Sequence, residues 1–210
     1  MAATPAALTA PPASARTETL FDGRSLNGWR HAGDAPLQLH GRTIRTGPGS
    51  GGLGLLYYAR KRYPDFQLML EFKAAEGANS GVHLRFPTPG GCSWIDCGYE
   101  VQINDTAADP RKTGSIYGFA DLDAQHAAAR PAGTWTRLRI RANGQTYTVY
   151  RDGSASTATS AAAAARATSG YTRTAALRTS SRSGPSGSAR SEPPPTRSDR
   201  RTTARPRPVR

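Results

Sequence analysis

Five polar side chains, among them two carboxylates and an imidazole that can transfer protons, lie on three segments that alternate between apolar and polar residues. The segments are FQLMLEFK (66–73), SGVHLRF (80–86) and YEVQIND (99–105). Alternation at period two sends successive side chains of a strand to opposite faces of a sheet. The apolar positions are then core, and the opposite face carries Glu71, His83, Arg85, Glu100 and Gln102.

If these three strands are neighbours in one sheet, two carboxylates, an imidazole and a guanidinium converge on one surface. The carboxylates and the imidazole can exchange protons with a bound substrate, and the guanidinium can donate hydrogen bonds to it. An ordinary solvated sheet face carries a similar mixture of charges. Arg85 then forms a surface ion pair of little energetic value, and His83 is a hydrogen-bonded surface histidine. The alternation alone leaves both interpretations open.

Two aromatic residues and two cysteines lie near these strands. Trp94, in the loop GGCSWIDCGYE, and Tyr117, in TGSIYGF, could each stack on the C–H face of a sugar ring, and ordinary packing explains either residue equally well. Cys92 and Cys97 lie five apart in the same loop, without a nearby His or second Cys pair at metal-ligand spacing. We expect a disulfide here, and two free buried thiols are the alternative.

Further strands follow from the same periodicity. Turn residues interrupt alternating segments around 37–44, 54–58, 113–119, 134–142 and 145–153, and Asn143-Gly144 predicts a two-residue hairpin turn between the last two. Six or more short strands within about 135 residues predict an all-β fold, a two-sheet sandwich of the jelly-roll kind.

The composition changes abruptly after Gly153. From Ser154 to Arg210 the chain consists almost wholly of Ala, Ser, Thr, Arg, Pro and Gly, which predicts a disordered tail because too little apolar surface is available for burial. The tail's 11 arginines against Glu192 and Asp199 supply +9 of the formal net charge of +13. Since they are scattered without interleaved aromatics, we predict no specific nucleic-acid binding. Non-specific attraction to polyanions stays open.

The first 17 residues are predicted to be a disordered leader or the remnant of a signal peptide. Ala13-Ser14-Ala15 has the small-x-small form of a signal-peptidase site. A signal would make the protein secreted or periplasmic. No run of 18 or more apolar residues is present, so the sequence predicts no membrane span.

Five motifs in order resemble a known family. They are LFDGRSLNGW, FQLMLEFK followed by NSGVHLRF, GYEVQIND, TGSIYGF and PAGTWTRLRIRANGQTYTVYRDG. Residues 20–153 are similar in these motifs to the 3-keto-disaccharide hydrolase domain, also called DUF1080. The resemblance implies a concanavalin A-like jelly-roll fold, an exported bacterial protein and a carbohydrate substrate oxidised at C3.

The resemblance also implies a chemistry and a set of residues. A ketone at C3 acidifies the C2 proton, so that a base can start an elimination at C1, and water then adds back. The family's motif positions fall on Glu71, Asn79, Ser80, Gly81, Arg85, Glu100, Gln102 and Tyr117. We expect Glu100 first, with Glu71 and His83, to be catalytic, and Arg85, Gln102, Asn79, Tyr117 and Trp94 to bind substrate. No cofactor is expected, and a role for a metal ion is left open. The alternative function is a non-catalytic carbohydrate-binding module.

The chain departs from the family's pattern after Arg151-Asp152-Gly153, where further strands are usual. The sequence therefore predicts a sandwich over residues 18–153 that lacks its last strands, followed by the tail at 154–210. Our hypothesis is that a frameshift replaced the closing strands, because a composition of this kind arises when a GC-rich gene is read out of frame. A natural disordered tail is the alternative.

Overall fold

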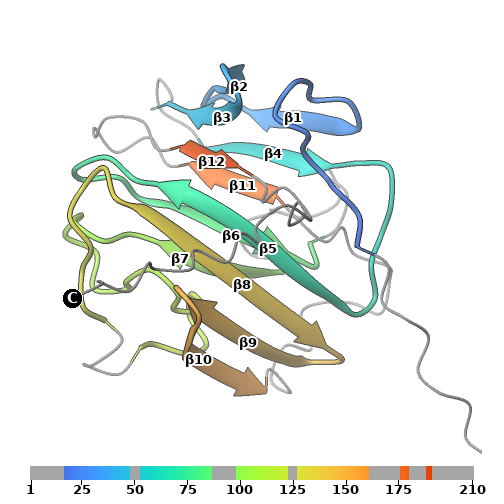
Figure 1. Ribbon diagram of the computed structural model, residues 1–210. Helices are drawn as coiled ribbons and strands as arrows, with labels where there is room; N and C mark the ends of the chain where they lie inside the picture. The colour runs from blue at the N-terminus through green and yellow to red at the C-terminus, as the bar shows by residue number, and fades with distance from the viewer. Residues whose placement is uncertain are drawn as a thin grey trace, which may run out of the picture.

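A computed structural model describes residues 17–47, 53–86, 98–122, 127–160, 176–179 and 188–190. All regular structure in these ranges is β, arranged as twelve strands in two sheets (Figure 1). A helix long and apolar enough to cross a membrane is absent from them.

The first sheet has five strands, all antiparallel to their neighbours, in the order β1-β4-β11-β6-β7. Their bounds are Trp29–Gly33 for β1, Gly54–Tyr58 for β4, Ala176–Thr179 for β11, Ser80–Leu84 for β6 and Tyr99–Ile103 for β7.

The second sheet has seven antiparallel strands in the order β10-β9-β8-β5-β12-β3-β2. Their bounds are Ser154–Ser160 for β10, Thr146–Arg151 for β9, Trp135–Asn143 for β8, Phe66–Lys73 for β5, Ser188–Arg190 for β12, Thr43–Thr46 for β3 and Leu37–His40 for β2.

One hydrophobic core lies between the two sheets. The five-stranded sheet contributes Leu56, Val82 and Val101, and the seven-stranded sheet contributes side chains such as Leu70 and Ile140. Each of these is buried, and for Leu70, Val82 and Val101 the period-two alternation predicted it. The structure confirms the predicted all-β jelly-roll sandwich.

The β8–β9 hairpin is confirmed, with its turn one residue later than predicted. Asn143 pairs with Thr146, so Gly144 and Gln145 form the two-residue loop. Gly144 has a φ of 52°, at the position where a type II′ turn has glycine. Asn143 is therefore the last residue of β8 and not part of the turn.

The chain continues as a strand beyond residue 153. Asp152 and Gly153, with φ values of 49° and 91°, link β9 to β10, which pairs along β9 up to the partners Ser160 and Thr146. Positive φ at both central residues is typical of a type I′ hairpin turn. The domain boundary predicted at residue 153 thus falls inside a hairpin.

Two further strands from the predicted tail complete the sheets. β11 pairs with β4 on one side and β6 on the other, and β12 lies in the same way between β3 and β5. The sequence predicted a disordered tail and a sandwich without its last strands. The structure instead has strands in this region, and they are members of both sheets. A strand between two others is held by backbone hydrogen bonds, which composition does not reveal. The frameshift itself stays a hypothesis.

Candidate functional site

Three of the predicted site residues lie together on the outer face of β6 and β7. His83 is the register partner of Glu100, and Gly81 is the partner of Gln102. Between these two rows, Val82 pairs with Val101 and both point into the core. Since successive side chains alternate, His83, Glu100 and Gln102 lie on the face opposite the core.

A short segment extends this face beyond β7. Ile116 bridges Val101 and is buried in the core, while the backbone N–H of Tyr117 donates to the Glu100 carbonyl at 2.9 Å. By alternation, Tyr117 lies on the same face as Glu100 and next to it. The strand predicted over 113–119 is therefore a bridging segment, but it delivers Tyr117 to the site.

The Glu100 side chain lies across Gly81 of the neighbouring strand. A Cβ atom at position 81 would lie 2.2 Å from Oε1 of Glu100 and 2.8 Å from its Cδ. Side chains never approach one another so closely, so a glycine at this position gives the carboxylate its room.

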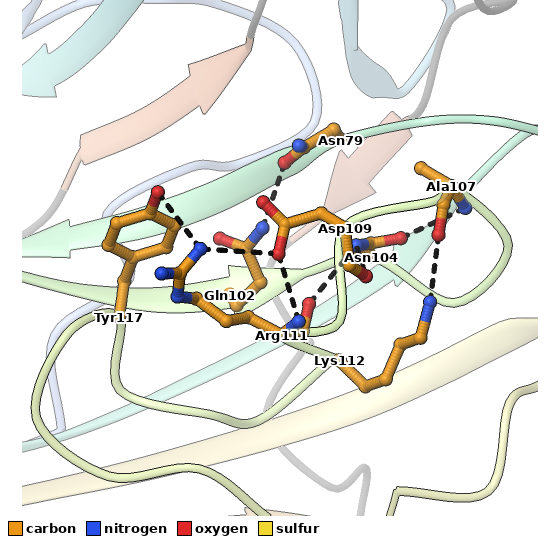
Figure 2. Close-up of polar contacts among 8 residues, drawn as sticks. All are labelled: Asn79, Gln102, Asn104, Ala107, Asp109, Arg111, Lys112 and Tyr117. Carbon is orange, nitrogen blue, oxygen red and sulfur yellow. Dashed lines mark hydrogen bonds and ion pairs between the residues drawn. The ribbon is translucent and has the colours of Figure 1, made fainter.

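Gln102 and Asn79 form a hydrogen-bonded pair beside this carboxylate. Gln102 Nε2 donates to Asn79 Oδ1 at 2.8 Å (Figure 2). Oε1 of Gln102 is buried and has no hydrogen-bond partner among the described residues. A buried acceptor without a donor costs free energy, which a hydroxyl of a bound ligand could recover.

His83, Glu100 and Tyr117 form a polar row across neighbouring strands. The exposure of these side chains to solvent increases along the row from His83 to Tyr117. His83 is 1% exposed, Glu100 5% and Tyr117 39%. Beside His83 lies a second apolar cluster of Leu55, Tyr57 and Phe86, and the His83 and Phe86 rings meet edge to face at 5.8 Å. The predicted surface histidine is therefore buried, and the row is open to solvent at Tyr117.

Arg85 does not join this site. Its φ of 50° interrupts the alternation after β6. Phe86 was predicted to lie in the main core, and it packs in the second cluster instead. The Arg85 guanidinium bonds to the carbonyl oxygens of Pro64 and Gly144 and to Asp65 Oδ1, and it lies 5.4 Å from the ring of the buried Tyr147. These contacts link three loops. The prediction that Arg85 lies on the same face as His83 is therefore wrong.

Glu71 lies on the other sheet. The neighbours of β5 are β8 and β12, so the prediction that the three polar strands adjoin in one sheet is wrong. Glu71 forms an ion pair with Arg137 of β8, with 3.1 Å between Oε1 and Nη2. Between β5 and β6 the chain passes from one sheet to the other, and alternation within each strand contains no information on that crossing.

Three predicted residues lie outside the described part of the chain: Trp94, Cys92 and Cys97. The predicted disulfide and the stacking role of Trp94 therefore stay predictions. Within the described ranges, no three His, Cys, Asp or Glu side chains lie close enough together to hold a metal ion.

The loop that follows β7 is organised by Asn104. Asn104 is fully buried, and its Nδ2 donates to the carbonyls of Asp109 and Arg111 at 3.0 and 3.1 Å. Its Oδ1 accepts from the Ala107 N–H at 3.0 Å (Figure 2). An asparagine before the turn-rich segment DTAADPRKTG was the available signal for such a loop anchor.

Arg111 is a residue of this region that sequence reasoning missed. Its Nη1 donates to the Tyr117 hydroxyl at 3.2 Å and lies 3.5 Å from Asp109 Oδ1 (Figure 2). Its guanidinium carbon lies 4.2 Å from the centre of the Tyr117 ring. The exposed aromatic ring of the site is therefore held by an arginine.

Two antiparallel sheets around one core, with a polar row on the outer face of one sheet, define the class as jelly-roll sandwiches. The structure is similar to that of a provisionally assigned glycosyl hydrolase from Parabacteroides distasonis, with a TM-score of 0.62 and 18% identity over 81% of this chain and 88% of that one. It is also similar to the carbohydrate-binding module CBM66 from Bacillus subtilis, with a TM-score of 0.52 and 12% identity over 78% and 92% of the two chains. At these identities the likeness concerns the fold alone.

The family follows from the sequence match. Residues 16–183 match the 3-keto-alpha-glucoside-1,2-lyase-like domain family, and the chain belongs to it. A 3-keto-disaccharide hydrolase from Bacteroides thetaiotaomicron is 28% identical in an alignment 151 residues long, which covers 58% of this chain and 51% of the relative. The chain thus spans about half the length of this curated relative.

Proposed function

We propose that this protein cleaves 3-keto-glycosides by elimination followed by hydration. The observation that carries the proposal is the Glu100 carboxylate, held over Gly81 and next to His83 and Gln102 on one sheet face. The family and the relative named a 3-keto-disaccharide hydrolase support the substrate class.

The reaction begins with removal of the C2 proton, which the neighbouring C3 ketone makes acidic. The C2–H electron pair forms the C1=C2 double bond as the C1–O bond breaks. The leaving oxygen takes a proton and departs as an alcohol. Water then adds to C1 of the resulting unsaturated ketone and C2 is protonated again, so that the net change is hydrolysis.

Two of the side chains suit the proton transfers. We assign Glu100 as the base at C2 and His83, its register partner, as the proton donor to the leaving oxygen. Their low exposure supports this assignment because it keeps bulk water from competing for the transferred proton.

The remaining residues suit sugar binding. Gln102 Oε1, buried without a hydrogen-bond partner in the described part of the chain, can accept from a sugar hydroxyl. The exposed ring of Tyr117 offers a surface for the C–H face of a sugar.

A non-catalytic carbohydrate-binding module is the second candidate. The observation that favours it is the contrast in exposure, because Tyr117 is open to solvent while Glu100 is nearly covered. A binding module needs Tyr117 and the hydrogen-bonded pair Gln102–Asn79, but it does not need a catalytic base.

Substitution of Glu100 by Gln separates the two functions. The amide keeps the shape of the side chain but cannot remove a proton, so turnover of 3-keto-trehalose or 3-keto-sucrose should fall by roughly a hundredfold or more with sugar binding retained. Glu71→Gln, the same change on the other sheet, is the matched control and should leave turnover unaffected. A wild-type protein that binds these sugars without cleaving them would favour the module.

A further inference from the structure

We infer that Arg111 is a further substrate-positioning residue, which holds the ring of Tyr117 and binds the hydroxyl groups of the leaving sugar. The inference rests on the proposed function, because it assumes that the bond to be cleaved lies beside Glu100. It adds a residue and a substrate preference, namely a leaving group that is itself a sugar.

The position of the leaving sugar follows from the exposure gradient of the row. If Glu100 reaches C2 of the keto sugar, that sugar lies at the buried end, beside His83 and Gln102. The other half of a disaccharide then extends toward the exposed end of the row, where Tyr117 lies directly next to Glu100.

The guanidinium of Arg111 has hydrogen-bonding capacity to spare at this end. A guanidinium carries five N–H donors, and Nη1 alone makes the contacts to Tyr117 and Asp109. No acceptor in the described part of the chain bonds to Nε or Nη2, and the side chain is 35% exposed. Three donors in one plane are therefore available to a ligand.

The orientation of Arg111 is set before any ligand binds. Asp109 Oδ1 accepts the Arg111 backbone N–H at 2.9 Å, and Asn104 holds the Arg111 carbonyl. A side chain whose backbone is fixed at both polar groups loses less freedom on binding than one on a mobile loop.

The neighbouring cation has a different place. Lys112 Nζ donates to the Ala107 carbonyl at 2.8 Å, within the loop. Figure 2 shows Arg111 extending toward Tyr117 and Lys112 toward Ala107. Of these two adjacent cations, Arg111 is the one directed to the site.

An arginine suits this role better than a lysine. Its planar fork can donate two parallel hydrogen bonds to neighbouring sugar hydroxyls while it stacks on an aromatic ring, whereas an ammonium is a single point charge. A lysine at position 111 should therefore recover only part of the binding.

The test compares a sugar leaving group with a small one. Wild type, Arg111→Ala, Arg111→Lys and the control Arg141→Ala are assayed on 3-keto-trehalose and on methyl 3-keto-glucoside, and trehalose binding is measured by calorimetry. Arg141 is an exposed residue of β8 in the other sheet. Arg141→Ala therefore removes the same charge as Arg111→Ala but at a position outside the site.

We expect Arg111→Ala to raise KM for 3-keto-trehalose and Kd for trehalose about tenfold, with kcat within about twofold. Arg111→Lys should lie between Arg111→Ala and wild type, and Arg141→Ala should match wild type. KM for methyl 3-keto-glucoside should not change. Equal effects of Arg111→Ala on both substrates, or unchanged KM and Kd for the disaccharides, would overturn the inference.

The proposed function can fail separately. If the wild type cleaves no 3-keto-glycoside but binds trehalose, and Arg111→Ala weakens that binding, the catalytic proposal is wrong while the assignment of Arg111 to sugar binding stands. A wild type that neither cleaves 3-keto-trehalose nor binds trehalose contradicts both.

Discussion

The carboxylate of Glu100 occupies the space that a side chain at position 81 would need, so Gly81 and Glu100 form one unit across β6 and β7. A methyl group on Gly81 would lie 2.2 Å from Oε1. Any residue but glycine at position 81 must therefore displace the proposed catalytic base.

Substitution of Gly81 by Ala should lower turnover by at least about tenfold and destabilise the fold by roughly 1–3 kcal/mol through the clash. Urea unfolding and turnover of 3-keto-trehalose measure the two effects. In the double variant with Glu100→Ala the clash is gone, so the two stability losses should not add. Additive losses would show that Gly81 and Glu100 do not interact.

Substitution of Arg85 by Ala should destabilise the protein without weakening sugar binding. The guanidinium joins Pro64, Asp65 and Gly144, and its loss leaves their acceptors without this donor, at a cost of roughly 2 kcal/mol. Arg137→Ala, which breaks the exposed ion pair with Glu71, is the control and should cost less than about 0.5 kcal/mol. A loss of trehalose affinity in Arg85→Ala would return Arg85 to the binding site.

Substitution of Asn104 by Ala should affect both stability and sugar binding. Its buried amide donates to the carbonyls of Asp109 and Arg111. The variant leaves both carbonyls without this donor, which should lower the free energy of unfolding by about 2–3 kcal/mol. Because the loop positions Arg111, trehalose affinity should fall as well. Asn143→Ala, at the exposed end of β8, should change neither the unfolding midpoint nor the affinity. Normal affinity in Asn104→Ala would show that the loop does not position the site.

Truncation after Gly153 should leave a protein much less stable than the full chain. The shortened chain lacks β10, β11 and β12, and the positions between β4 and β6 and between β3 and β5 then have no strand. Unpaired backbone groups and open strand edges favour unfolding and aggregation. Thermal unfolding and the fraction of soluble protein are the measurements. A chain ending at residue 153 with the melting temperature of the full chain would show that β10, β11 and β12 contribute nothing to stability.

Substitution of Tyr147 by Phe should remove part of the loss of stability at alkaline pH. Burial raises the pKa of Tyr147 from 10.0 to about 12, although the positive charge of Arg85 opposes the shift. The stability that depends on the neutral phenol is fully present below pH 10 and is lost as the pH rises toward 12, up to about 2 kcal/mol. The free energy of unfolding measured from pH 9 to 12 should therefore fall less steeply in the variant. Parallel curves would contradict the assignment.

Much of the fold could be predicted because it depends on local periodicity. Strand β5 has the predicted bounds, and its alternating side chains Leu70 and Phe72 point into the core. The shared face of His83 and Glu100 was predicted in the same way, since each alternates with a buried valine. Sheet membership was not predictable in this way, and Glu71 was therefore placed with the wrong neighbours.

The end of the domain shows two local signals in conflict. Asp152-Gly153 is a hairpin dipeptide and predicts a following strand, whereas the composition after it predicts disorder. The structure has the strand, β10, because a type I′ turn reverses the chain and the edge of β9 offers backbone hydrogen bonds. These do not depend on apolar side chains.

The sequence by itself determined strands such as β5 to β9, much of the apolar core and the outward direction of His83, Glu100 and Gln102, because each depends on the chemistry and spacing of residues within one strand. Only the tertiary structure decided that Glu100 lies over Gly81, that Arg85 and Glu71 lie elsewhere and that Arg111 holds Tyr117. Those relationships join strands and loops whose order in space depends on the packing of the whole sandwich, which no single segment encodes.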